Sequence, residues 1–248
     1  LVTYKETHAN AKIDPTAAWT GTWRDPRFSP PADGGRPENA LTGTIFMAND
    51  TGQDYSIVIP EADGKMRFWR NTSVATLGAG QSATLPVGTL GYEWDADLDN
   101  GFRPPGLVRL SSTTLTIGGA LLDYGSSYGS GTLNHALTLY RHSSGARVFG
   151  AGTIQWSWGL DANHDGPSMV TDARMQQATV NLFADMNAQP GSLQPGLVAA
   201  TASTDSTAPT SAITAPAAGA NLPVNSAVTI TGTAADVGGV VGGIEVSV

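Results

Sequence analysis

Four carboxylates occupy alternate positions in residues 91–101: Glu93, Asp95, Asp97 and Asp99. In an extended segment, side chains two residues apart point to the same face, so the four would form one acidic row. Like charges side by side repel, and a carboxylate is costly to bury without a cation or hydrogen-bond donors. Only 14% of the chain is charged, so this concentration favours a site for a metal, a substrate or a cationic partner.

A second acidic segment, residues 161–172, has the spacing of a calcium-binding loop. Positions one, three, five and twelve carry Asp161, Asn163, Asp165 and Asp172, and Gly166 stands at position six. The alternative is a metal-free loop closed by Asx turns, with Asp172 as the N-cap of the helix that follows. Both interpretations stay open.

Two tryptophans, Trp156 and Trp158, are two residues apart, and we expect them to share a face. They would form the bottom of a substrate pocket or cover the end of a sheet. The preceding small residues 150–152 would allow a ligand to approach closely. The histidines lack metal-site spacing, but His8 lies four residues after Tyr4 and could face the same site. A carbohydrate-binding surface is a further alternative, with stacking by Trp19, Trp23, Trp69, Trp156 and Trp158.

The bulk composition excludes several classes of function. The 248 residues carry a net charge of −8, which argues against binding to nucleic acid or to anionic membranes. No apolar run reaches the length of a membrane span, and a chain without Cys has neither disulfides nor thiolate metal sites. The chain begins and ends within strand-like sequence, so we interpret it as a fragment of a longer polypeptide.

Short strands dominate the predicted elements of residues 1–196. The candidates are Leu1–Glu6, Gly43–Met47, Tyr55–Ile59, Leu107–Ile117, Ala136–His142 and Arg147–Thr153. One helix is predicted after Asp172 as N-cap, with an apolar stripe of Met175, Ala178, Thr179, Leu182, Phe183 and Met186. The order of strand 147–153, loop and helix is typical of the last step of a layered α/β sheet.

The composition changes after residue 196. Residues 197–211 are predicted to be a linker, because Ala199–Ser211 has no aromatic or basic residue and suits a solvated, extended chain. Residues 212–248 contain short alternating strands around 212–216, 227–234 and 244–248, separated by Gly, Asn and Pro turns. This last part resembles a truncated immunoglobulin-like β module of the kind that follows secreted bacterial enzymes and surface proteins.

Several segments, in the same order, are similar to one known family. They are Val2–Glu6, Trp23–Pro26, Arg36–Gly43, Gly91–Asp95, Val148–Asp161 and Met175–Thr179. Together they resemble the C-terminal domain of the large subunit of N,N-dimethylformamidase over roughly residues 1–190. The resemblance implies an α/β, β-rich fold, with part of a glutamine-amidotransferase-like layered sheet, a long β insertion and then the fragment of an all-β Ig-like sandwich.

The same resemblance implies a mononuclear iron site that activates water for amide hydrolysis. The family holds iron with two tyrosinates and one glutamate, and by position Tyr4 and Glu93 correspond to one of each. The first tyrosine would lie upstream, in a His-Asp-Glu-Tyr-Trp segment that this chain does not contain. The resemblance therefore predicts Glu93 as a catalytic residue. His8 is added as a catalytic candidate from its spacing to Tyr4, and we expect Asp95, Asp97 and Asp99 to form a solvated turn.

The sequence thus favours an iron-dependent amidohydrolase-like domain of a secreted or cell-surface protein, acting on a small amide and completed by an upstream half of the same polypeptide. The alternative is a non-catalytic binding or scaffold module, which could bind carbohydrate or calcium. Without the resemblance, Glu93 would be interpreted as a surface residue or as a partner of Arg103 or Arg109.

Overall fold

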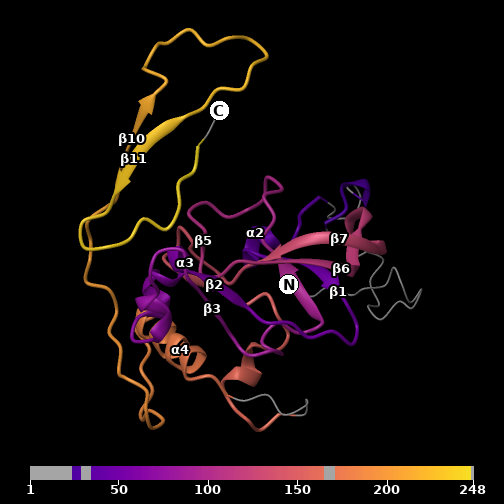
Figure 1. Cartoon of the computed structure of the whole chain (residues 1–248), viewed down its shortest axis with the longest axis vertical. Helices are drawn as coiled ribbons and strands as arrows, with labels where there is room; N and C mark the ends of the chain where they lie inside the picture. The colour runs from indigo at the N-terminus through magenta and orange to yellow at the C-terminus, as the bar shows by residue number, and fades with distance from the viewer. Residues whose placement is uncertain (1–23, 29–34, 165–170, 247–248) are drawn as a thin grey trace.

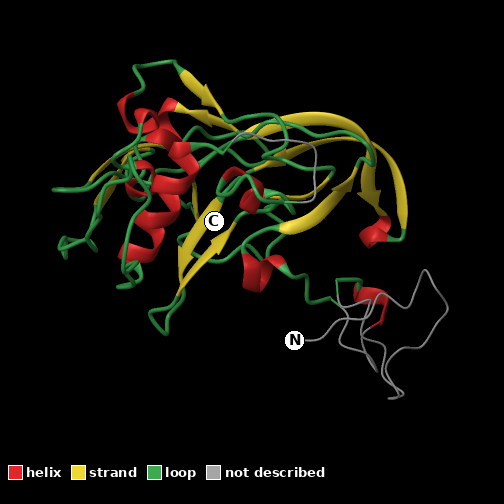
Figure 2. Cartoon of the chain, turned by 90° about the horizontal axis from the view of Figure 1, so that it is seen from below, coloured by secondary structure: helices red, strands yellow, loops and turns green. Residues whose placement is uncertain are grey.

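A computed structural model describes residues 24–28, 35–164 and 171–246 of the chain. Within these ranges the fold is β-rich, with several small sheets and few helices (Figure 1). The predicted strand Leu1–Glu6 lies outside the described residues. Figure 2 shows long curved strands on one side of the molecule and most of the helical segments on the other.

The largest sheet has the strand order β4-β1-β6-β7. Its strands are β1 (Ile45–Asn49), β4 (Glu93–Ala96), β6 (Thr113–Leu122) and β7 (Ser127–His135), and each neighbouring pair is antiparallel. Phe46 pairs with Asp95, and a bulge separates Phe46 from Ala48, which pairs with Trp94. The inner face of β1 and β4 therefore carries Ile45, Ala48, Trp94 and Ala96, which are all buried.

Three smaller sheets complete the β structure. The first has the order β5-β8-β9, formed by Val108–Arg109, Thr138–Arg141 and Arg147–Gly150. The second pairs β2 (Val58–Pro60) with β3 (Ser82–Thr84), and the third pairs β10 (Thr210–Ala215) with β11 (Thr231–Ala235). All pairs of described strands are antiparallel. The predicted order of strand, loop and helix around residue 150 is present, but no parallel pair of described strands accompanies it.

The predicted single strand Leu107–Ile117 is wrong. The chain leaves β5 and joins β6 in a different sheet, and Leu110–Ser112 make the crossing between them. Leu110 donates its N–H to the carbonyl of Leu137, and Ser112 donates its N–H to the carbonyl of Val58. These two hydrogen bonds join the crossing to different segments, so a single apolar run of the sequence contributes strands to two sheets. The β7 strand was not predicted, because Ser127–His135 is rich in Gly and Ser and lacks an apolar run.

Short helical segments connect these strands. They are η1 (Pro26–Phe28), α2 (Asn39–Thr42), α3 (Glu61–Gly64), η2 (Arg67–Trp69), η3 (Ser73–Thr76), η4 (Asp123–Gly125) and η5 (Trp156–Gly159). The core lies between them and the sheets, and its largest fully buried side chains include Trp69, Trp94, Ile57, Leu90 and Leu137.

The predicted helix is confirmed as α4 (Ala173–Asp185). The carboxylate of Asp172 caps it by accepting a 2.8 Å hydrogen bond from the N–H of Arg174. Met175, Ala178 and Leu182 of the predicted stripe are buried, whereas Phe183 is 49% exposed. The buried face also includes Gln177, which bonds to Val198, and Asn181, whose amide donates to the carbonyls of Phe68 and Arg70.

The segment that follows α4 differs from the solvated linker that the sequence predicts. Ala200 is buried against Val180 and Ala184 of α4. The side chain of Gln177 exchanges two hydrogen bonds with the backbone of Val198, at 2.7 and 2.9 Å. The first residues of the predicted linker therefore pack on α4, because a buried glutamine satisfies their backbone groups. The division into domains at 197 and 211 stays a prediction.

The C-terminal residues form the two-stranded sheet β10–β11, which stands apart from the larger sheets in Figure 1. These two strands match the first two that the sequence predicts there, while residues 244–246 form no strand. Most of their side chains are exposed. The Ig-like identity of residues 212–248 stays a prediction.

Candidate functional site

The acidic row divides into two unlike parts. Glu93 and Asp95 point to the outer face of β4, as the alternation predicts, and both line one cavity. Asp97 lies just beyond the strand and is buried, whereas Asp99 is exposed. The prediction that Asp95, Asp97 and Asp99 form a solvated turn is therefore wrong for the first two and right only for Asp99.

The cavity beside Glu93 and Asp95 has a volume of about 270 Å³. Its walls come from β1, β4 and the segment after β9: Phe46, Glu93, Asp95, Gly152, Thr153 and Ile154. The two carboxylates form a polar side, and Phe46 and Ile154 supply apolar side chains. A small molecule with a polar centre and short apolar substituents matches this lining.

Glu93 has no partner of its own in the described part of the chain. No side chain there donates a hydrogen bond to its carboxylate, and the two arginines that the sequence offers as partners bind Asp97 instead. Glu93 is thus a half-buried carboxylate on a cavity wall whose oxygens can accept a ligand, because no described side chain pairs with it.

Asp95 is held by one neutral donor. The hydroxyl of Thr44 donates a 2.7 Å hydrogen bond to Asp95 Oδ2. Burial raises the pKa of Asp95 and the nearby charge of Glu38 adds to the rise, while the Thr44 hydrogen bond and the more distant charge of Arg24 oppose it. Glu38 is itself paired with Arg24. Asp95 therefore lies in a pocket wall without a cation in direct contact among the described residues.

Asp97 has the opposite surroundings. Its side chain is fully buried, and Arg103 Nε and Arg109 Nε lie 2.9 and 2.6 Å from its two oxygens. Burial alone would raise the pKa of Asp97, but the hydrogen bonds from the two arginines outweigh it and lower the pKa. This arrangement ties the end of β4 to β5 and explains why Asp97 needs no other ligand.

The segment Ala151–Ile154 runs beside β4, and its residues Gly152, Thr153 and Ile154 form one wall of the cavity. Asp95 donates its N–H to the carbonyl of Gly152 at 2.8 Å, and Thr153 forms an isolated bridge with Trp94. Behind this wall lies His135, whose Nε2 is 3.1 Å from the carbonyl of Ala151. Neither this wall nor His135 was predicted; the small residues 150–152 were the only signal of it in the sequence.

The two tryptophans do not share a face as predicted, because Trp156–Gly159 forms the 3₁₀ turn η5 instead of a strand. The Trp156 ring lies 5.7 Å from that of Phe149 and 6.4 Å from that of Phe68, within the core cluster. The Trp158 ring stacks on His164 at 4.7 Å. Neither residue lines the cavity beside Glu93. Trp69 is fully buried and cannot stack on a carbohydrate, whereas for Trp156 and Trp158 that role stays a prediction.

The other predicted ligands are only partly described. Tyr4, His8, Trp19, Trp23 and Asp165 lie outside the described residues. Asn163 donates its N–H to Asp161 Oδ1 at 2.7 Å, which is an Asx turn, while the Asp172 carboxylate is used by the helix cap and by Arg174. Among residues 24–28, 35–164 and 171–246, no three acidic, His or Cys side chains are grouped to hold a metal ion. The calcium loop stays a prediction.

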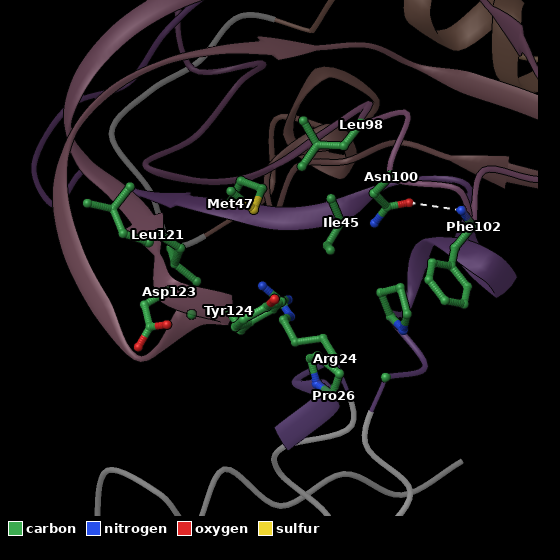
Figure 3. Close-up of a pocket in the computed structure, with 14 residues that line it drawn as sticks. Arg24, Pro26, Ile45, Met47, Leu98, Asn100, Phe102, Leu121, Asp123 and Tyr124 are labelled. Carbon is green, nitrogen blue, oxygen red and sulfur yellow. Dashed lines mark hydrogen bonds between the residues drawn. The ribbon is translucent and has the colours of Figure 1, made fainter. Parts of the chain in front are cut away.

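A larger cavity of about 570 Å³ lies beside η1 and η4 (Figure 3). Its lining is mostly apolar and includes Ile45, Met47, Leu98 and Leu121. The charged groups on its wall are engaged by the chain itself: Arg24 binds Glu38 and the carbonyl of Phe46, and Asp123 binds Arg27 and Ser126. Tyr124 on the same wall has Arg27 over its ring at 5.3 Å. Because the described charged groups of this cavity are all paired, the smaller cavity with the unpaired Glu93 is the better candidate site.

The chain was compared with known proteins. The sequence model of one family, described as N,N-dimethylformamidase beta subunit-like, C-terminal, matches residues 1–172. No curated protein and no solved structure matches the chain. In the described part of the chain, every helix is too short or too polar to cross a bilayer.

Proposed function

The chain belongs to the family of N,N-dimethylformamidase beta subunit-like C-terminal domains, and we propose from this membership that it takes part in the hydrolysis of the C–N bond of small amides. The proposed site is the 270 Å³ cavity lined by Glu93 and Asp95. The observation that carries the proposal is the position of the Glu93 side chain and its lack of an ion pair in the described chain. The residue that the family resemblance singles out is a carboxylate on a cavity wall, without an ion pair among the described residues.

The donor chemistry at this cavity fits iron in part. Carboxylate and phenolate oxygens are hard donors suited to ferric iron, and Glu93 keeps its oxygens clear of other partners in the described chain. In the proposal, Glu93 and Tyr4 hold the ion together with a tyrosine from an upstream segment. A ferric ion there would supply Lewis-acid activation of the amide carbonyl and of water.

The residues of the chain would orient the substrate. The side chains of Phe46 and Ile154 would flank the apolar substituents of the amide, because they provide the apolar part of the cavity wall. Thr44 fixes Asp95 through Oδ2, so the other oxygen of Asp95 would remain to hydrogen-bond with the bound substrate. Gly152 and Thr153 would close the remaining side and limit the site to small amides.

The test is amide hydrolysis by the iron-loaded chain extended upstream to include the missing tyrosine, with N,N-dimethylformamide, formamide and acetamide as substrates and amine release as the readout. We expect Glu93→Gln to lower kcat/KM on the order of 1000-fold and to remove any tyrosinate-to-iron absorption band. The matched control is Asp99→Asn, which neutralises an exposed carboxylate of the same acidic row. A colourless, metal-free protein, or equal activity in both variants, contradicts the proposal.

The finer setting belongs to the same proposal. The glutamine-amidotransferase-like layering is proposed from the family membership. The Ig-like nature of residues 212–248, and with it a secreted or cell-surface location, is proposed from the alternating strand pattern of those residues. The net charge of −8 supports the expectation that neither nucleic acid nor an anionic membrane is a partner.

A further inference from the structure

His135 is a buried histidine next to the candidate site that the proposed reaction does not use. It ends β7 and is completely buried between the ring of Trp94, 6.1 Å away edge-on, and the backbone of Gly152. Burial lowers the pKa of His135 to about 4, with a smaller opposing contribution from its hydrogen bond to Ala151. The imidazole is therefore neutral near pH 7, with its single proton on one nitrogen.

The hydrogen bonds of His135 fix which nitrogen carries that proton. Nε2 lies 3.1 Å from the carbonyl oxygen of Ala151, which only accepts, so Nε2–H is the donor. Nδ1 is then a buried acceptor, and no group in the described chain donates to it. A histidine with one buried nitrogen unsatisfied is a poor choice for stability alone.

The bond to Ala151 acts at the point where the cavity wall begins. Gly152 follows at a φ of +60°, and a Cβ at this position would lie 3.2 Å from His135 Nε2 and 3.4 Å from the Cβ of Asp95. The backbone of Gly152 is thus enclosed between the imidazole and Asp95. On its other side, the Gly152 carbonyl accepts the N–H of Asp95, and Ile154 donates to the carbonyl of Glu93 at 3.5 Å.

We propose that His135 is a positioning residue, which holds the wall Ala151–Ile154 against Glu93 and Asp95 through the Ala151 carbonyl. It touches neither substrate nor metal. Its effect is to fix the distance between the wall and the two carboxylates, and so the room in which the substrate is oriented. This inference rests on the proposed function for its effect on catalysis, but its effect on the wall is independent of any activity.

The test compares two substitutions of similar size. His135→Gln keeps an N–H donor at the reach of Nε2, whereas His135→Met fills the same space without a donor. In the 248-residue chain, hydrogen exchange of the Asp95 amide, which is bonded to Gly152, should become about tenfold faster in the Met variant and stay near wild type in the Gln variant. The Asp97 amide, bonded to the carbonyl of Asn134, is the internal control and should not change.

In the active protein, the Met variant should lose on the order of 100-fold in kcat/KM, with the loss mainly in kcat, and the Gln variant should restore most of it. Wild-type exchange at Asp95 in the Met variant overturns the inference. It is also overturned if both His135→Met and His135→Leu fail to fold, because His135 would then be needed for the core. If the wild type hydrolyses no amide, the proposed function fails, while the exchange experiment still decides the role of His135.

Discussion

Two parts of the acidic row, Glu93 with Asp95 and the neighbouring Asp97, differ in what surrounds their carboxylates. Asp97 has two arginines in direct contact and a fully buried side chain. Glu93 and Asp95 line a cavity, and the described residues bring no cation into contact with either. Residues 93–97, one strand and its continuation, thus contain one carboxylate used for stability and two that are not.

The difference teaches how to separate a structural carboxylate from a functional one. Burial by itself does not distinguish them, because it acts to raise the pKa of both Asp95 and Asp97. The hydrogen-bond partners determine the direction of the pKa shift. Two guanidinium groups lower the pKa of Asp97 despite its burial, whereas the single Thr44 hydroxyl does not offset the effect of burial at Asp95. Four substitutions, with Asp99→Asn as a control, can break or sharpen this comparison.

The largest effect on stability is expected from Asp97→Asn. Removing the charge leaves two arginines facing a neutral side chain in a buried place, which should lower the free energy of unfolding by about 3 kcal/mol. Urea unfolding followed by tryptophan fluorescence measures the loss. Asp99→Asn, on the exposed side of the same turn, should change stability by less than about 0.5 kcal/mol. Equal values for the two variants would remove the basis of the comparison.

A smaller effect is expected from the arginines taken one at a time. Arg103 is 22% exposed in its side chain and Arg109 is 45% exposed, so water screens the second ion pair more. We expect Arg103→Gln to cost about 1.5 kcal/mol and Arg109→Gln about 0.5 kcal/mol. Double-mutant cycles with Asp97→Asn measure each coupling. A larger coupling for Arg109 would contradict the dependence on burial.

The sequence predicted the local features of this region well. The period-two spacing placed Glu93 and Asp95 on one face of an extended segment, and the cap and apolar stripe located the helix that begins after Asp172. These features depend on neighbours within a few residues. The family resemblance then separated Glu93 from the other carboxylates, which the spacing alone could not do.

What the sequence missed depends on contacts between distant segments. Asp97 is buried because the chain turns back and brings Arg103 and Arg109 to it, and no pattern in residues 91–101 contains that turn. His135 reaches the site through the pairing of β7 with β6 and of Asp97 N–H with the carbonyl of Asn134. Trp156 and Trp158 were placed wrongly, because a single 3₁₀ turn changes the period from two to three.

The only gain in stability is expected from Asp95→Asn in the metal-free chain. The amide keeps the volume of the carboxyl group and can still accept the hydrogen bond of Thr44, but it removes a charge that burial disfavours. The free energy of unfolding should therefore rise by about 1 kcal/mol at pH 8. Hydrolytic activity should fall, since the substrate loses a charged group on the cavity wall.

The pH dependence separates the two aspartates by sign. The folded-state pKa of Asp95 is raised, so its contribution to stability is complete below the unfolded pKa and is lost as the pH rises through the folded one. The folded-state pKa of Asp97 is lowered, so its contribution is present above the unfolded pKa and is lost as the pH falls through the folded one. Asp95→Asn should thus gain stability relative to wild type on going from acid to pH 8, and Asp97→Asn should lose it. If the stability of the two variants changed in the same direction, Asp95 and Asp97 would be equivalent. The distinction between a carboxylate of the candidate site and one that stabilises the fold would then be contradicted.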